Sequence, residues 1–391
     1  MKTENRILII LFLAVITVPA LMMFQSAGRY LPGDNRMAAA IPKFIKDDGS
    51  LVNRTDIEDF ANDNIGFRTA APNLDTRVMY ELFHLMLDTA QLQGKENNLF
   101  AGDDRYYPSR RAPYQPLSEE ELEENGHNIE AAADYFKAKD IPFLFITIPD
   151  KEEVYPELYP DTFLKRPDQT RLSQLTDWLT ENTEVDAYDL TGALREKASA
   201  SDDMLWYETG DSAHWNYLGA YYGYREIMGR LQKYDPARKA LTLDDFEIAV
   251  TTEPYTNWDG SFRYRDLDNT MYTFDYKAGF KSALVDYAND PWAPPDQLEL
   301  AGFEKNGHFY HYHNDTQEDQ LVFFGDSYIY QFLLPYFAET YGDVYLFHLP
   351  TDYRIMRPVL DLIGADFVIL EKVERSFNGD DFLLMAEEFA P

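Results

Sequence analysis

Apolar and polar residues follow one another along the chain in blocks that predict alternating helices and buried strands. Ser118 and Glu121 form a capping box, which predicts a helix from there to about residue 139. The apolar run 142–148 then predicts a buried parallel strand. Further helices are predicted at 167–181, 216–231, 328–339 and 354–363, and strands at 185–190, 321–324, 343–348 and 366–370. This rhythm predicts an α/β fold, with helices on both faces of a mostly parallel sheet.

Two stretches depart from this rhythm. Residues 241–319 are rich in turn-forming residues and carry short alternating runs, as at 246–250 and 308–312, so we expect an insertion of antiparallel hairpins. Apolar spacing over 57–87 predicts a helical region instead. The predicted organisation is a segment 1–28 that anchors the chain, a linker and helical region 29–110, and a main domain 111–391.

The N-terminus decides the predicted compartment. Residues Ile7–Phe24 carry no charge, and a helix of this length spans roughly 27 Å, close to the apolar thickness of a bilayer. Lys2 and Arg6 precede it, so the positive-inside rule places the rest of the chain outside the cytoplasm. A cleaved signal peptide is the alternative, and it also exports the domain. The expected location is therefore a cell membrane, with one crossing and an extracytoplasmic domain.

Charge and composition exclude several classes of function. The chain has 68 acidic and 35 basic residues and a net charge of -33, so it would repel nucleic acid. It has no cysteine, which excludes a thiol nucleophile and thiolate metal ligands. The 28 tyrosines suit carbohydrate, because an aromatic ring stacks on a sugar face, although most such rings belong to cores.

Gly325-Asp326-Ser327 follows the predicted strand 321–324 and opens a predicted helix. A serine at such a turn exposes its hydroxyl at the carboxyl edge of the sheet, near backbone N–H groups that stabilise an oxyanion. The motif therefore makes Ser327 a candidate nucleophile. Asp326 or Ser327 acting only as a helix cap is the alternative.

Asp211 and His214 form the second motif. A serine nucleophile needs a base, and the base needs an acceptor that orients it. Residues three apart allow the carboxylate to reach Nδ1 and leave Nε2 for Ser327. A lone histidine is more often structural, and the presence of Gly-Asp-Ser is what favours a catalytic role for His214.

Other polar residues have weaker signals. Lys151 follows the strand 142–148 and, with Trp215 and Tyr328, is predicted to contact substrate; for Lys151 a surface salt bridge is the alternative. His308, His311 and His313 lie close together, but hydrogen-bonded histidines on a hairpin are favoured over a metal site. No metal and no cofactor are predicted.

These motifs together resemble the alginate O-acetylation proteins AlgJ and AlgX and the related DHHW proteins. In chain order the similar pieces are Asn62–Arg68 (D-x-x-G-F-R), Asn98–Phe100 (W-L-F), Pro149–Pro156 (P-x-K-x-x-x-Y-P), His214–Ala220 (H-W-x-x-x-G-A), Gly325–Ser327 (G-D-S) and Glu371–Arg375 (a terminal E-R). In AlgX-like proteins the aspartate stands two residues before the histidine, where this chain has Ser212. Asp202 and Asp203 are therefore reserve candidates for the role given to Asp211.

The resemblance implies an SGNH-hydrolase-like, flavodoxin-like domain. It also implies an extracytoplasmic O-acetyltransferase that passes acetyl groups through Ser327 to an exported or cell-surface polysaccharide. A membrane-bound O-acyltransferase is then the expected acetyl donor. Two alternatives stay open: a polysaccharide O-acetyl esterase, and a catalytically silent carbohydrate-binding subunit of an export complex.

Overall fold

The structure is a computed structural model, and the chain divides into two compact units: Met1–Asp88 with Thr256–Asp266, and Thr89–Tyr255 with Leu267–Pro391. The described residues are 3–26, 28–31, 36–46, 49–68, 74–75, 78–79, 82, 91–101, 116–161, 169–209, 211, 213–254, 268–285, 309–348, 356–377, 379, 381–382 and 385–389. His308 and Ser212 lie outside them.

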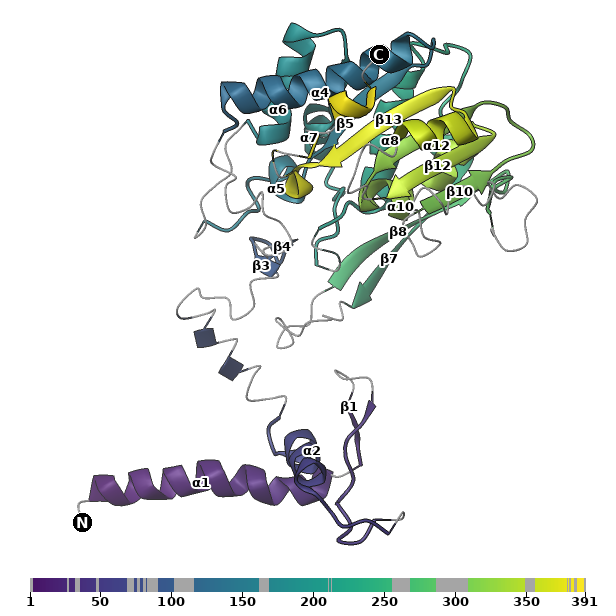
Figure 1. The fold of residues 1–391 in the computed structure, drawn as a ribbon. Helices are drawn as coiled ribbons and strands as arrows, with labels where there is room; N and C mark the ends of the chain where they lie inside the picture. Colours follow the sequence, from purple (N-terminus) through teal and green to yellow (C-terminus); the bar gives the residue numbers. More distant parts are fainter. Residues whose placement is uncertain are drawn as a thin grey trace. The chain divides into compact units, whose positions relative to one another are not determined.

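The second unit is built on a seven-stranded sheet of order β6-β5-β13-β11-β12-β10-β9 (Figure 1). Five neighbouring strands are parallel: β6 (Asp186–Asp189), β5 (Phe143–Ile148), β13 (Phe367–Val373), β11 (Gln320–Gly325) and β12 (Asp343–His348). β10 (Phe309–His313) adds antiparallel to β12, and β9 (Ala283–Leu284) adds to β10. The predicted mostly parallel sheet is confirmed, and its antiparallel edge makes it a mixed sheet.

Helices cover both faces of this sheet because alternate residues of its strands point to opposite sides. On one face Phe145, Phe324 and Leu370 join a core with α4 (Glu119–Lys137), α6 (Arg171–Asn182), α12 (Met356–Ile363) and α13 (Met385–Phe389). On the other face Phe323 packs against Phe337 of α11 (Leu334–Ala338). There α10 (Ser327–Phe332) contacts β12 and α8 (Tyr217–Leu231), and α7 (Thr191–Ser199) contacts α8.

Local sequence explains where several helices begin and end. Ser118 and Thr170 cap α4 and α6 through capping boxes. The predicted helix 328–339 is interrupted, because Pro335 lies in the first turn of α11 and cannot continue the hydrogen bonding of α10. The short helices α5 (Lys151–Val154) and α7 were not predicted.

Antiparallel pairs lie outside the main sheet. β7 (Phe246–Pro254) and β8 (Asp268–Tyr276) form a long hairpin-like pair within the predicted insertion. β3 (Gln91–Gln93) pairs with β4 (Leu99–Ala101). β9 and β10, also from the predicted insertion, extend the main sheet, so this part of the chain contributes to the central fold. The boundaries proposed from the sequence at 28, 110, 241 and 319 remain predictions.

The first unit contains α1 (Thr3–Ser26), α2 (Arg54–Asn64) and the short pair β1 (Tyr30–Leu31) with β2 (Arg36–Met37). In the helical region predicted over 57–87, α2 begins earlier, at Arg54, where Asn53 and Asp56 form a capping box, and ends at Asn64. Among the described residues that follow, 74–75, 78–79 and 82 are also helical. Arg36 donates to both carboxylate oxygens of Asp63 at 2.7 Å. These bonds lower the pKa of Asp63 to about 2.

Within α1 the segment Asn5–Gln25 has a mean hydropathy of 2.9. It is the one helix among the described residues that is long and apolar enough to cross a membrane, a property that signal sequences share. The N–H of Gly66, just after α2, donates to the carbonyl of Pro19 at 2.9 Å. This contact joins the second half of α1 to the loop after α2.

Candidate active site

Ser327 is the first residue of α10, directly after the central strand β11, at the carboxyl edge of the sheet. The cap of α10 is Asp326, whose side chain accepts the N–H of Tyr328 at 2.9 Å. Its other carboxylate oxygen accepts the N–H of Val373 at 3.2 Å. Because Asp326 caps the helix, the hydroxyl of Ser327 is not needed for capping and is left partly exposed.

The turn before Ser327 packs against a buried carboxyl group. Glu371, at 1% exposed, accepts the N–H of Asp326 at 2.8 Å. Burial, together with the charge of Asp326, raises the pKa of Glu371 well above its ordinary value. A Cβ at Gly325 would lie 2.6 Å from the Glu371 Oε2 atom, so a larger residue at this position would displace the Glu371 carboxylate. Together these contacts fix the backbone that presents Ser327.

His214 lies between Ser327 and Asp211 and forms a contact with each. Nε2 of His214 lies 2.7 Å from Oγ of Ser327, and Nδ1 lies 2.7 Å from Oδ2 of Asp211. An ionised carboxylate only accepts hydrogen bonds, so the proton on His214 fits on Nδ1, which leaves Nε2 free to accept the serine hydroxyl. The three side chains form one hydrogen-bonded chain, although His214 and Ser327 are 113 residues apart in the sequence.

The carboxylate of Asp211 also folds its own loop. Its Oδ1 accepts the N–H of Ala213 at 3.1 Å and that of His214 at 3.2 Å. Burial alone would raise the pKa of Asp211, but the hydrogen bond and charge of His214, the N–H of Ala213 and the charge of Arg375 hold it below its ordinary value. Asp211 is therefore ionised at neutral pH.

Arg375 was not assigned a role from the sequence, and it lies beside the reacting groups. It is 3% exposed, and its Nη2 lies 3.4 Å from Nε2 of His214. Its Nη1 donates to Oδ1 of Asp150 at 2.6 Å and to the carbonyl of Ala213 at 2.9 Å. The terminal E-R piece of the resemblance was the only signal in the sequence that pointed to it.

The substrate contact predicted for Lys151 does not fit its burial. The side chain is 1% exposed, and Nζ donates to the carbonyls of Leu99, Tyr207 and Glu208 at 3.0, 2.8 and 3.2 Å. Burial lowers its pKa to about 7, against the raising effect of nearby carboxylates. The surface salt bridge considered for Lys151 does not fit either. Its Nζ atom joins two other backbone segments beneath the surface, one at Leu99 and one at residues 207–208.

Trp215 and Tyr328 are also buried rather than placed to touch substrate. Both are 0% exposed, and their rings pack edge to face with centroids 4.9 Å apart. The hydroxyl of Tyr328 accepts from Nη1 of Arg375 at 3.0 Å and donates to the carbonyl of Ala213. Both rings lie under the loop that carries His214, so their role is to support it. Whether such a ring is buried or exposed cannot be predicted from its neighbours in the sequence.

Two glycines of α8 allow this helix to lie close to Leu205 and Trp215. A Cβ at Gly219 would lie 2.1 Å from the carbonyl oxygen of Leu205, and one at Gly223 would lie 2.6 Å from the ring of Trp215. Asn216 caps α8 by accepting the N–H groups of Leu218 and Gly219 at 3.0 Å. The helix therefore lies close to Trp215, which directly follows His214.

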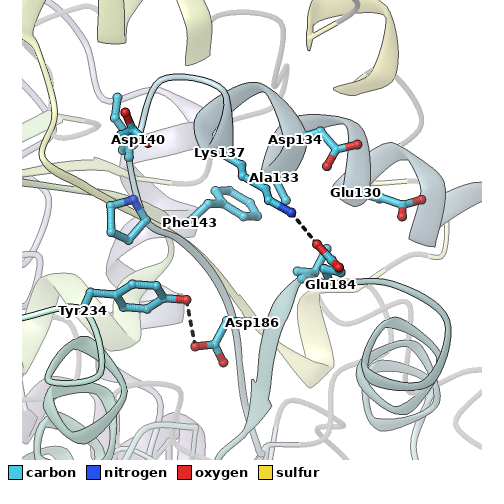
Figure 2. A pocket seen from close by; sticks show the side chains of 12 residues that line it. Glu130, Ala133, Asp134, Lys137, Asp140, Phe143, Glu184, Asp186 and Tyr234 are labelled. Carbon is cyan, nitrogen blue, oxygen red and sulfur yellow. Dashed lines mark hydrogen bonds and ion pairs between the residues drawn. The ribbon is translucent and has the colours of Figure 1, made fainter.

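A cavity of about 330 Å³ lies elsewhere, at the amino ends of β5 and β6 (Figure 2). Glu130, Asp134 and Lys137 of α4 line one side, and Lys137 pairs with Glu184. On the other side the hydroxyl of Tyr234 donates to Asp186 at 3.1 Å. Parallel strands carry Ser327 at their opposite, carboxyl end, and none of Ser327, His214 and Asp211 lines this cavity.

The sheet, with a serine at the carboxyl end of a central strand and a histidine hydrogen-bonded to it, defines an α/β fold of the SGNH-hydrolase-like class. Residues 92–259 match the family described as SGNH hydrolase-like domain, acetyltransferase AlgX. The resemblance predicted from the sequence is therefore confirmed over this region, which includes Asp211 and His214 and ends before Ser327.

Two solved structures of one protein agree with the fold. PatB1 of Bacillus cereus is 14% identical with a TM-score of 0.52, over 75% of this chain and 98% of that one. The structure of PatB1 with a sulfonyl adduct is 15% identical with a TM-score of 0.52, over 75% of this chain and 97% of that one. The O-acetyltransferase domain of Pseudomonas putida AlgJ is 16% identical, with coverage of 76% and 99% and a TM-score of 0.46. At these identities the likeness to PatB1 concerns the fold alone. A comparison with curated protein sequences gives no match.

Proposed function

We propose that the protein is an O-acetyltransferase that moves acetyl groups to a polysaccharide through an acetyl-serine at Ser327. The observation that carries this proposal is the chain of two 2.7 Å contacts from Asp211 through His214 to Ser327. The match of residues 92–259 to the acetyltransferase AlgX family supports acetyl as the transferred group. The same geometry would serve an O-acetyl esterase, in which water replaces the sugar hydroxyl.

The proposed reaction has two steps. In the first, Oγ of Ser327 attacks the carbonyl carbon of the acetyl donor, Nε2 of His214 takes the hydroxyl proton, and the donor leaves with that proton as an acetyl-serine forms. In the second, a sugar hydroxyl gives its proton to Nε2 and attacks the acetyl-serine, and His214 returns the proton to Ser327. Asp211 stabilises the imidazolium that exists within each step.

Arg375 is a positioning residue in this proposal. Its guanidinium group holds the carbonyl of Ala213, the residue before His214, and lies against the ring of Tyr328 at 4.8 Å from the centroid. Asp150, which is 1% exposed, forms an ion pair with Arg375, so the buried positive charge of the guanidinium group is balanced. The arrangement keeps the imidazole of His214 directed at Ser327.

An exposed ring near Ser327 suits a sugar acceptor. Tyr330 lies three residues after Ser327 on α10 and is 41% exposed. Its ring stacks on Tyr310 of β10, with centroids 4.1 Å apart and planes inclined by 25°. Stacked, partly exposed aromatic rings offer a flat apolar face for a pyranose ring. We therefore assign Tyr330, in place of Trp215 and Tyr328, to acceptor binding.

An acetyl-ester assay with and without acceptor tests the proposal. The full chain in detergent should release acetate from a chromogenic acetyl ester, and an added oligosaccharide should become acetylated. Tyr330→Ala should lower transfer to the oligosaccharide several-fold while leaving ester turnover nearly unchanged. If the ester is hydrolysed and an added oligosaccharide is not acetylated, the result would favour the esterase. If no acetyl ester is turned over, the result would favour the silent binding subunit.

The proposed place of action is outside the cytoplasm. In the first half of α1 the apolar side chains are exposed, with Leu8, Ile10 and Phe12 each at 65%, so a surrounding lipid phase would bury them. A membrane-bound O-acyltransferase is the proposed acetyl donor, and the polysaccharide is then acetylated on the far side of the membrane.

Protease treatment of intact spheroplasts tests this topology. The domain after α1 should be digested from outside, and the chain should stay with the membranes in a carbonate wash. A protected chain in the cytosol would contradict export. A secreted form that begins after residue 26 would contradict only the anchor, because α1 would then be a signal sequence.

A further inference from the structure

Three side chains of types that ligate metals in proteins meet on the antiparallel edge of the main sheet, away from Ser327. His311 and His313 lie two apart on β10, so both point to the same face. Asp343, the first residue of β12, pairs directly with His313 in the sheet register. The ligand atoms of these three residues lie within 4.8 Å of one another.

The two imidazoles converge on one carboxylate oxygen. Nε2 of His311 lies 2.6 Å, and Nδ1 of His313 lies 2.9 Å, from Oδ1 of Asp343. Two nitrogens and a carboxylate oxygen are the ligands of many zinc sites, at about 2.0–2.2 Å from the ion. Ligand atoms of a tetrahedral site lie roughly 3.3 Å apart at those bond lengths, so small side-chain rotations would admit the ion.

The surroundings fix these ligands while leaving access from outside. The ring of His311 is 1% exposed and stacks on Tyr345, with centroids 4.2 Å apart and planes inclined by 17°. The side chains of His313 and Asp343 are 15% and 22% exposed. One ligand is thus held rigidly by the core, and the other two border the surface through which an ion would enter.

We propose that His311, His313 and Asp343 bind one divalent ion of the zinc type, with water as the remaining ligand. Hydrogen-bonded histidines were favoured here from the sequence because no carboxylate stands at a zincin spacing, whereas the fold brings Asp343, 30 residues after His313, beside them. Binding uses neutral imidazoles, whose protons move to the ring nitrogens that face away from the ion. No net proton is released when both histidines start neutral.

The site is structural rather than catalytic because of its place in the sheet. Asp343 begins β12, whereas His348 ends it and pairs with Gly325, beside Ser327. Five steps along a strand separate the two ends by roughly 17 Å. The ion would join β10 to β12 and so stabilise the edge of the sheet, and the inference does not depend on the proposed acetyl transfer.

Zinc titration of the full chain in detergent, stripped of metal with a chelator, tests the proposal. Calorimetry and elemental analysis should give one Zn²⁺ per chain, and Zn²⁺ should raise the midpoint of thermal unfolding by mass action. Co²⁺ should also bind and show the visible absorption of a tetrahedral site without sulfur ligands.

Matched variants locate the ion. Asp343→Asn keeps the size of the side chain and a hydrogen-bond acceptor, and it should weaken Zn²⁺ binding about tenfold or more, as should His313→Gln. His127→Gln removes an exposed histidine paired with Glu130 on α4 and should leave the affinity unchanged. Lack of saturable binding, or full affinity in both site variants while they remain folded, would overturn the proposal.

Discussion

Ser327→Ala is expected to abolish release of acetate from a model acetyl ester, with a loss of about three orders of magnitude or more in kcat. The reason is that Oγ of Ser327 is the atom hydrogen-bonded to Nε2 of His214, and alanine has no atom there to form the acetyl-enzyme. The fold should survive, because Asp326 rather than Ser327 caps α10. Circular dichroism and thermal unfolding check the fold, and initial rates check the activity.

Ser118→Ala is the matched control. Ser118 caps α4 by accepting the N–H of Glu121, so its loss should cost about 1 kcal/mol of stability and leave turnover intact. The two serines therefore separate capping from catalysis, the alternatives that the sequence left open. Undiminished turnover by folded Ser327→Ala protein would remove the acetyl-serine mechanism.

Asp211→Asn should lower kcat by up to about four orders of magnitude while changing KM little. The carboxylate accepts Nδ1–H of His214 at 2.7 Å, and its pKa lies below the ordinary value, so a full negative charge faces the imidazole at neutral pH. Asparagine removes that charge and can present an amide N–H to Nδ1, which favours the wrong tautomer. Rates on one acetyl ester measure the effect.

Asp203→Asn is the control for this prediction, because Asp203 was a reserve candidate for the same role. Its carboxylate accepts from the hydroxyls of Tyr272 at 3.1 Å and Ser201 at 2.9 Å. Turnover should stay near that of the unchanged chain. If Asp203→Asn lost activity and Asp211→Asn kept it, the assignment of the orienting carboxylate would be wrong. If both kept activity, Ser327 and His214 would act as a dyad.

Much of the fold could be predicted because its signals are local. The apolar run at 142–148 became β5, and the capping box at Ser118 became the start of α4, since burial on both faces and capping are decided by neighbouring residues. The pairing of Ser327 with His214 was predicted on chemical grounds instead, because a serine nucleophile needs a base and the base needs an acceptor that orients it.

The rest of the site depends on contacts between distant parts of the chain. Arg375 meets Asp150 across 225 residues, and no local pattern encodes that pairing. Lys151 was expected to contact substrate because it follows the strand 142–148, and Trp215 and Tyr328 were expected to contact substrate as well. Their burial follows from packing against Leu99, Gly223 and Arg375, which only the folded chain reveals.

The close approach of α8 to Trp215 has a consequence for recognising this site in other genomes. The glycine five residues after His214 is sterically required, because a methyl group at position 219 would collide with the carbonyl of Leu205. A search profile should therefore weight the tryptophan and glycine of H-W-x-x-x-G as heavily as the histidine. A chain that keeps the histidine but carries a larger residue in place of Gly219 would have to move its helix, and with it the base.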